Sequence, residues 1–143
     1  MNFTLLKHAM ILPVQDTHFI ADHELDFGRF RFYKNLVIGE IFEGAKMDFD
    51  KALPLFAIAA LYYSEENPVV YLSDRKTSYS LDPTMHREIF KLFPFLLGYG
   101  VIAYNDLNFQ VARLEQRFLL CPSGVFRSMD EALAWAAGLI ENQ

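Results

Sequence analysis

The stretch that decides the fold runs from Val69 to Pro83 and reads VVYLSDRKTSYSLDP. It opens with four β-branched, aromatic or aliphatic residues, the pattern of a strand that is covered on both faces in a parallel sheet. It closes with Asp82 and Pro83, an N-cap carboxylate directly before a proline at the first helical position. The polar residues between these ends predict a loop at the carboxyl end of a strand, where open α/β sheets usually bind ligands and partners.

The residues before this stretch predict a hairpin and a helix. Phe27 to Tyr33 alternates apolar and charged side chains, as a half-buried strand does, and Leu36 to Phe42 forms a second strand after a two-residue connection. A helix is expected from the N-cap Asp48 to about Ser64. Because no charged side chain occurs from Ala52 to Tyr63, we expect this helix to be buried on two sides, or to form a homodimer face or a pocket wall.

The residues after the stretch predict alternating helices and strands. We expect a helix from Pro83 to about Leu92, then a turn at Gly98 to Gly100 that leads into a buried strand from Gly100 to Tyr104. A helix that begins at Asn105 follows, and its apolar stripe is expected to face the sheet. The stripe contains Leu107, Val111, Leu114 and Phe118.

The C-terminal part completes the same layer. Gly124 to Arg127 forms a short last strand, and Ser128 with Glu131 forms a capping box at the start of the last helix. Strands that alternate with single helices imply right-handed crossovers and a mainly parallel sheet. The whole chain, residues 1–143, is therefore predicted to be a single α/β domain with about four helices, in which residues 1–21 form an arm or an edge strand.

The bulk composition limits the classes of function. The chain has 143 residues, of which 52% are hydrophobic and 22% charged, enough to bury a sizeable core. Its net charge of −5 argues against nucleic acid as a partner, because phosphate binding needs a basic surface. The longest apolar run is too short to span a bilayer, and the N-terminus lacks the pattern of a signal peptide. With a single cysteine and no internal disulfide, we expect a cytoplasmic protein without a membrane span.

No metal site is expected from the sequence. The best set of nitrogen and oxygen ligands is His18, Asp22, His23 and Glu24. Its two histidines lack the three- or four-residue spacing of a helical ligand pair, and the segment is predicted to be an exposed turn. We therefore expect neither a metal nor a cofactor.

Catalysis has no specific motif either. His86 could act as a general base for Ser78 or Ser80, and Asp74 could orient its ring. No nucleophile elbow accompanies these residues, so we expect a protein that is not an enzyme. Cys121 lacks a CxxC partner and a basic flank, which indicates a structural thiol.

Several motifs give the chain a resemblance to a known family. They are Phe27-Gly28 to Tyr33, Val37 to Ile41, Glu43-Gly44, Ser73-Asp74-Arg75, Ser78-Tyr79-Ser80 and Asp82-Pro83, together with Val125 to Ser128, Asp130-Glu131-Ala132 and Trp135. From about Asp22 to Ile140 the sequence resembles small bacterial proteins of the SpoIIAA-like branch of STAS domains. The resemblance implies a mainly parallel sheet with an N-terminal antiparallel hairpin, and a regulatory or protein-interaction module of the cytoplasm.

The resemblance also implies a binding surface on the loop after the central strand and on the helix that follows. The candidate residues are Asp74, Arg75, Ser78, Tyr79, Ser80, Asp82, Thr84 and Arg87. Anti-sigma-factor antagonists of this class are switched by phosphorylation of a serine at the N-terminus of that helix. Here Asp82 to Met85 stands at that place, and Ser78 and Ser80, earlier in the loop, are the candidates for phosphorylation. The loop is locally basic, which suits an acidic partner or an anionic ligand.

A second hypothesis is a ligand carrier. The CRAL-TRIO lipid-carrier type is a relative of this fold, and it implies a hydrophobic ligand. Phe90, Phe93 and Phe95 cluster around Pro94 and could line an apolar pocket, although aromatic rings also fill the core of a small domain. Two readings therefore stand side by side: a protein-interaction module that forms a homodimer, and a carrier or sensor of a small apolar or anionic ligand.

Overall fold

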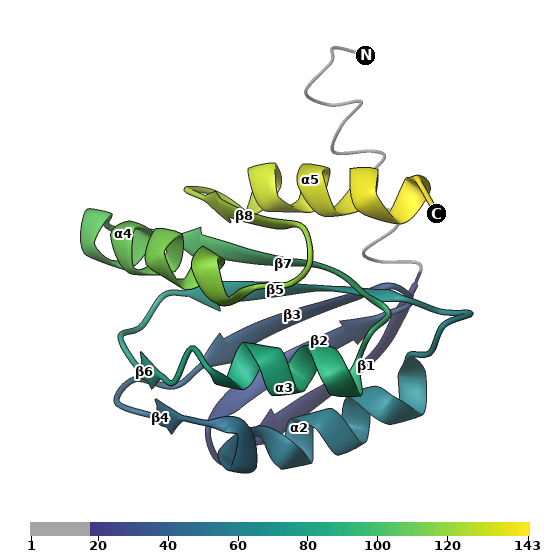
Figure 1. Cartoon of the computed structure of the whole chain (residues 1–143), viewed down its shortest axis with the longest axis horizontal. Helices are drawn as coiled ribbons and strands as arrows, with labels where there is room; N and C mark the ends of the chain where they lie inside the picture. Colours follow the sequence, from purple (N-terminus) through teal and green to yellow (C-terminus); the bar gives the residue numbers. More distant parts are fainter. Residues whose placement is uncertain (1–17) are drawn as a thin grey trace.

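A six-stranded sheet forms the centre of the computed structural model, which describes residues 18–143 (Figure 1). In spatial order its strands are β1 (Phe19–Leu25), β2 (Gly28–Tyr33), β3 (Leu36–Ile41), β5 (Val69–Arg75), β7 (Leu96–Ala103) and β8 (Ser123–Phe126). The first three strands pair antiparallel, and β3, β5, β7 and β8 pair parallel. This arrangement confirms the mainly parallel sheet with an N-terminal hairpin. The predicted arm before residue 18 lies outside the described residues.

Helices cover both faces of the sheet. They are α2 (Phe49–Tyr62), α3 (Met85–Leu92), α4 (Asp106–Glu115) and α5 (Met129–Glu141). A short 3-10 helix, η1 (Gln116–Phe118), continues α4. α2, α3 and α4 lie on one face and α5 on the other (Figure 1). The described part of the chain thus has the four predicted helices, and none of them is long and apolar enough to cross a membrane.

The core follows the alternation of the strands. Phe30 and Phe32 of β2 are fully buried beneath α2, and Val70 and Leu72 of β5 are fully buried beneath α5. The starts of α2, α4 and α5 agree with the predicted caps. Oxygens of Asp48, Asn105 and Ser128 each accept a hydrogen bond from the backbone N–H three residues later.

The segment from His18 to Glu24 was predicted to be an exposed turn, and that prediction is wrong. It belongs largely to β1, which pairs with β2 along its whole length. The sequence signal is weak because β1 is an edge strand with only partial burial, so its side chains do not alternate strongly. An exposed ion pair between Glu24 and Arg29, 2.9 Å apart, joins the two strands.

The turn predicted at Gly98 to Gly100 is also wrong, because these residues lie inside β7. Their glycines serve close packing. A Cβ atom on Gly98 would lie 2.6 Å from Leu139 and 2.9 Å from Trp135, and one on Gly100 would lie 2.9 Å from Trp135. The absence of side chains therefore lets α5 approach the sheet.

The apolar stripe of α4 faces away from the sheet, contrary to the prediction. Its side chains are exposed: Leu107 by 72%, Val111 by 49%, Leu114 by 57% and Phe118 by 40%. The inward face carries Ala112 and Glu115 instead, because the small alanine fits against β7 and the glutamate has buried partners.

α2 buries one side and not two. Ala52 and Phe56 face the core, whereas Leu53 is 45% and Leu61 is 78% exposed. The expectation of a helix enclosed on two sides is therefore wrong, and its inner side contributes to a cavity that is described below. At the C-terminal end of α2 the Tyr63 hydroxyl donates to the carbonyls of Tyr33, at 2.6 Å, and Leu36, at 3.1 Å.

The segment between β5 and α3 is held by a small second sheet. In it β4 (Lys46–Met47) pairs parallel with β6 (Ser80–Leu81). α3 begins at Met85, two residues later than predicted, because Asp82 closes a turn before it. The Asp82 carboxylate accepts hydrogen bonds from the backbone N–H of Thr84 at 3.0 Å and from its hydroxyl at 2.7 Å.

Candidate functional site

The candidate site lies towards the carboxyl end of β5, on the face of the sheet that α2, α3 and α4 cover. Tyr71, Ser73 and Arg75 alternate along this face, and the strand continues to Arg75. The prediction that Arg75 lies in the loop after the strand is therefore wrong, since β5 includes it, and Asp74 and Arg75 are only 3% and 6% exposed. β5 is longer than its apolar run because Arg75 has charged partners inside the fold.

Glu115 of α4 joins two side chains from different elements. Its Oε1 lies 2.5 Å from Nη2 of Arg75, and its Oε2 accepts a hydrogen bond of 2.6 Å from Nε2 of His86 on α3. The Arg75 side chain also donates to the hydroxyl of Ser73, which bonds the hydroxyl of Tyr79 at 3.1 Å. We call Arg75, Glu115 and His86 the buried triad, because all three are at least 94% buried.

The surroundings of the buried triad keep its carboxylate charged. Burial alone would raise the pKa of Glu115, but the hydrogen bond from His86 and the charge of Arg75 hold that pKa below its ordinary value. Burial raises the pKa of the Tyr79 and Tyr99 hydroxyls, so both stay neutral at physiological pH. A carboxylate that uses both oxygens inside the fold is a fixed crosslink between α3, α4 and β5.

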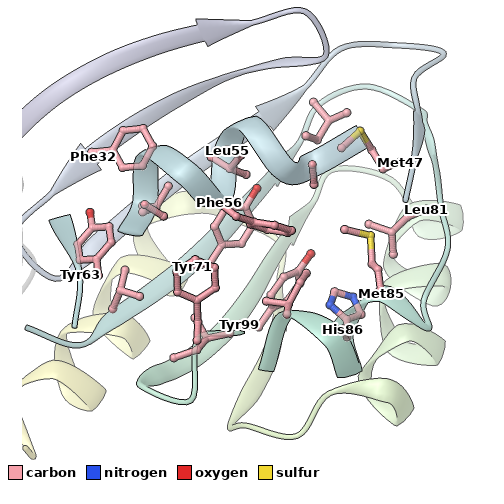
Figure 2. Close-up of a pocket in the computed structure, with 18 of the residues that line it drawn as sticks. Phe32, Met47, Leu55, Phe56, Tyr63, Tyr71, Leu81, Met85, His86 and Tyr99 are labelled. Atoms are coloured by element: carbon pink, nitrogen blue, oxygen red, sulfur yellow. The ribbon is translucent and has the colours of Figure 1, made fainter. Parts of the chain in front are cut away.

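An apolar cavity lies next to the buried triad, between the sheet and helices α2 and α3 (Figure 2). Its volume is about 100 Å³. Hydrophobic side chains from both layers form most of its wall, including Phe32, Phe56, Ala59, Met85 and Ile89. The cavity extends to Met47 of β4 and Leu81 of β6, so the small second sheet closes one end of it.

Two hydroxyl groups in the wall have no hydrogen-bond partner among residues 18–143. Tyr71 and Tyr99 both line the cavity, and their rings lie 5.3 Å apart. Within residues 18–143 no hydrogen bond reaches either hydroxyl, and since no fully buried side-chain nitrogen or oxygen there is unpaired, both oxygens border open space. His86 lies edge-on to the Tyr99 ring at 4.8 Å, and its Nε2 is already bonded to Glu115. The two tyrosine hydroxyls therefore give the wall free hydrogen-bonding capacity.

The residues predicted to form one binding surface fall into two groups. Ser78, Ser80, Asp82, Thr84 and Arg87 are exposed, whereas Asp74 and Arg75 are buried and Tyr79 packs its ring under the Arg75 guanidinium at 5.5 Å. Asp74 accepts a hydrogen bond of 2.7 Å from the Tyr104 hydroxyl. His86 bonds Glu115, so the sequence-based combination of His86, a loop serine and Asp74 is not assembled.

Of the three phenylalanines predicted to line a pocket around Pro94, Phe93 lines the cavity. Phe93 and Phe95 both line a second, more open hollow against the outer side of α2, and Phe90 lines neither. Sequence reasoning missed Glu115, the centre of the buried triad. Its only signal is position, three residues after the small Ala112 on the same side of α4.

Cys121 lies half-buried beside Tyr99 and Val101. Burial raises the pKa of its thiol to about 11. The thiol is therefore almost wholly protonated at neutral pH, which agrees with the structural role predicted from the sequence.

These features define an open α/β sheet domain with an apolar cavity beneath two helices. No family model and no curated protein sequence matches the chain. Among solved structures it is similar to an uncharacterised DUF3478-family protein with a SpoIIAA-like fold from Shewanella loihica. The two are 15% identical with a TM-score of 0.47, over 82% of this chain and 91% of that one.

Proposed function

We propose that this protein is a non-enzymatic binding domain of the cytoplasm that senses or carries a small, mainly apolar molecule. The proposed site is the cavity between the sheet and helices α2 and α3. One observation supports it above the others: an apolar cavity whose wall holds the hydroxyls of Tyr71 and Tyr99, neither of which has a hydrogen-bond partner among residues 18–143.

The empty space is costly for a protein of this size. At the usual penalty per unit volume, a cavity of about 100 Å³ lowers stability by about 2 kcal/mol. A core that served only as a support would gain from larger side chains at Ala52 or Ala59. Apolar cavities stay dry and take up small apolar molecules, so the space is suited to a ligand of about the size of benzene.

The hydroxyls define the polar part of that ligand. A molecule with an apolar body and one hydroxyl or carbonyl group could bond Tyr71 or Tyr99, which would otherwise stay unpaired inside an apolar wall. Because burial raises the pKa of both tyrosines, each can donate as well as accept a hydrogen bond. An isolated charge would be costly in these surroundings, so a neutral ligand is favoured over an anionic one.

Filling the cavity tests this proposal. Benzene at ten times its dissociation constant is expected to stabilise the wild-type protein by about 1.4 kcal/mol in thermal or urea unfolding. Ala59→Leu, which extends a side chain into the cavity, is expected to raise stability by about 1 kcal/mol and to abolish the effect of benzene. Ala60→Leu is the matched control, because Ala60 is the next residue of α2, is exposed and lies outside this cavity wall.

Phenol and Tyr99→Phe test the polar end of the site. Phenol differs from benzene by one hydroxyl, and loss of its hydrogen bond to Tyr99 is expected to weaken phenol binding about fivefold while benzene binding stays unchanged. Equal stabilisation of the wild-type protein and Ala59→Leu by benzene would contradict the cavity as the site. Equal losses for both probes in Tyr99→Phe would contradict the role of the hydroxyl.

A second candidate function is a protein-interaction module, as the sequence resemblance implies. The exposure of Ser78, Ser80 and Arg87 on the segment after β5 favours it, because this segment is held in place and open to a partner. Native mass spectrometry of freshly purified protein separates the two candidates. Excess mass that is lost on denaturation supports a bound ligand, whereas a phosphate-sized excess that persists supports a serine switch.

A further inference from the structure

The outward stripe of α4 is an apolar surface without a partner among the described residues. Leu107, Val111, Leu114 and Phe118 are spaced by four, three and four residues, the a/d repeat of a helix that packs against another helix. All four are between 40% and 72% exposed. Figure 1 places α4 at the edge of the molecule, where a second helix could reach it.

We propose that two copies of this protein form a homodimer by packing their α4 stripes antiparallel around a two-fold axis. The axis passes between Ala112 and Arg113. In that register Leu107 of one copy lies opposite Phe118 of the other, and Val111 lies opposite Leu114. All four residues of the stripe then meet an apolar counterpart, as an isologous interface requires.

Charge favours the antiparallel direction over the parallel one. The N-terminal turn of α4 is acidic through Asp106, whereas its second half and η1 carry Arg113 and Arg117. An antiparallel pair brings the acidic end of each helix towards the basic end of the other, and it also opposes the two helix dipoles. A parallel pair would place like charges and like dipole ends together.

The size of the surface suits a weak to moderate dimer. Two neighbours of the stripe in sequence are also exposed, Tyr104 by 49% and Leu120 by 60%. With the four residues of the stripe they make six large apolar side chains. Together they offer on the order of 600 Å², somewhat below the roughly 800 Å² per partner of a standard interface. A patch of this size is at the upper end of what monomers leave exposed.

Sedimentation equilibrium of the full chain tests the interface. The wild-type protein is expected to be a dimer, and Leu114→Glu is expected to weaken the dimer about a hundredfold because it buries a charge at the centre of the stripe. Leu61→Glu is the matched control, since Leu61 is 78% exposed on α2 and is expected to leave the dimer intact. Circular dichroism of both variants is the control that checks whether they are folded.

A pair of cysteine variants tests the register. In a Cys121→Ser background, a mixture of Val111→Cys and Leu114→Cys chains is expected to form disulfide-linked dimers under mild oxidation, and far fewer should form from either chain alone. Cross-linking of Val111→Cys with itself would show a parallel pair. A monomeric wild-type protein, or a dimer lost in Leu61→Glu and kept in Leu114→Glu, would overturn the proposal.

Discussion

Glu115→Ala is expected to lower the free energy of unfolding by about 3–5 kcal/mol, the usual loss when one member of a buried charge network is removed. The substitution leaves Arg75 and His86, which are 6% and 4% exposed, without the carboxylate that both of them contact. Urea denaturation monitored by circular dichroism measures the loss. Glu88→Ala is the matched control: Glu88 makes an exposed pair with Lys91 at 3.4 Å, so the change should be well under 1 kcal/mol.

The pH dependence of the same variant adds an independent measurement. The pKa of Glu115 is lower in the folded protein than its ordinary value of 4.5, so the unfolded chain takes up a proton more readily. The stabilisation by Glu115 is therefore complete at neutral pH and is lost as the pH falls below about 4.5. The difference between wild-type protein and Glu115→Ala should shrink over that range. A constant difference from pH 7 to pH 3 would contradict the role of the carboxylate charge.

Gly39→Ala is expected to cost about 2–3 kcal/mol, because it overfills a tightly packed part of the core. A Cβ atom at this position on β3 would collide with the Tyr71 hydroxyl and would lie 2.9 Å from two ring atoms of Phe30. Adding Tyr71→Phe removes the hydroxyl, so the double variant should recover part of the loss. Chemical denaturation of the two single variants and the double variant gives the interaction energy directly.

Gly138→Ala is the matched control for this packing argument. A Cβ atom on Gly138 would meet nothing within 4 Å, and the residue lies inside helix α5. The substitution should therefore stabilise the protein by about 0.5–1 kcal/mol through helix propensity. Strict additivity of Gly39→Ala and Tyr71→Phe would show that the hydroxyl is not the obstacle.

The regular elements could be predicted from the sequence where a local pattern decides them. The apolar run at Val69, the alternation around Phe30 and the capping residues Asp48 and Ser128 each gave an element that the structure contains. These signals depend on neighbours within a few residues. β1 lacked such a signal, because its pairing with β2 stabilises it more than its own burial does.

The direction of α4 and the buried triad could not be predicted in the same way. An amphipathic pattern identifies which side of a helix is apolar, but it does not determine whether that side faces the sheet or a second molecule. Glu115 turns inward because Arg75 and His86, 40 and 29 residues away in the sequence, converge on it. The sequence marked Arg75 as a candidate binding residue and His86 as a possible general base because of their residue types. Only the tertiary structure identifies the carboxylate that they share.

The split of the sheet into an antiparallel and a parallel half also sets the order in which the chain can assemble. Two-residue turns join β1 to β2 and β2 to β3, so these strands meet at a small entropic cost of loop closure. Every later strand of the six-stranded sheet must wait until a helix has crossed the sheet, and such distant contacts slow folding. During synthesis the hairpin side leaves the ribosome before the parallel side, with Phe30 and Phe32 uncovered until α2 follows. The interval before α2 arrives is therefore when the nascent chain is most exposed to aggregation.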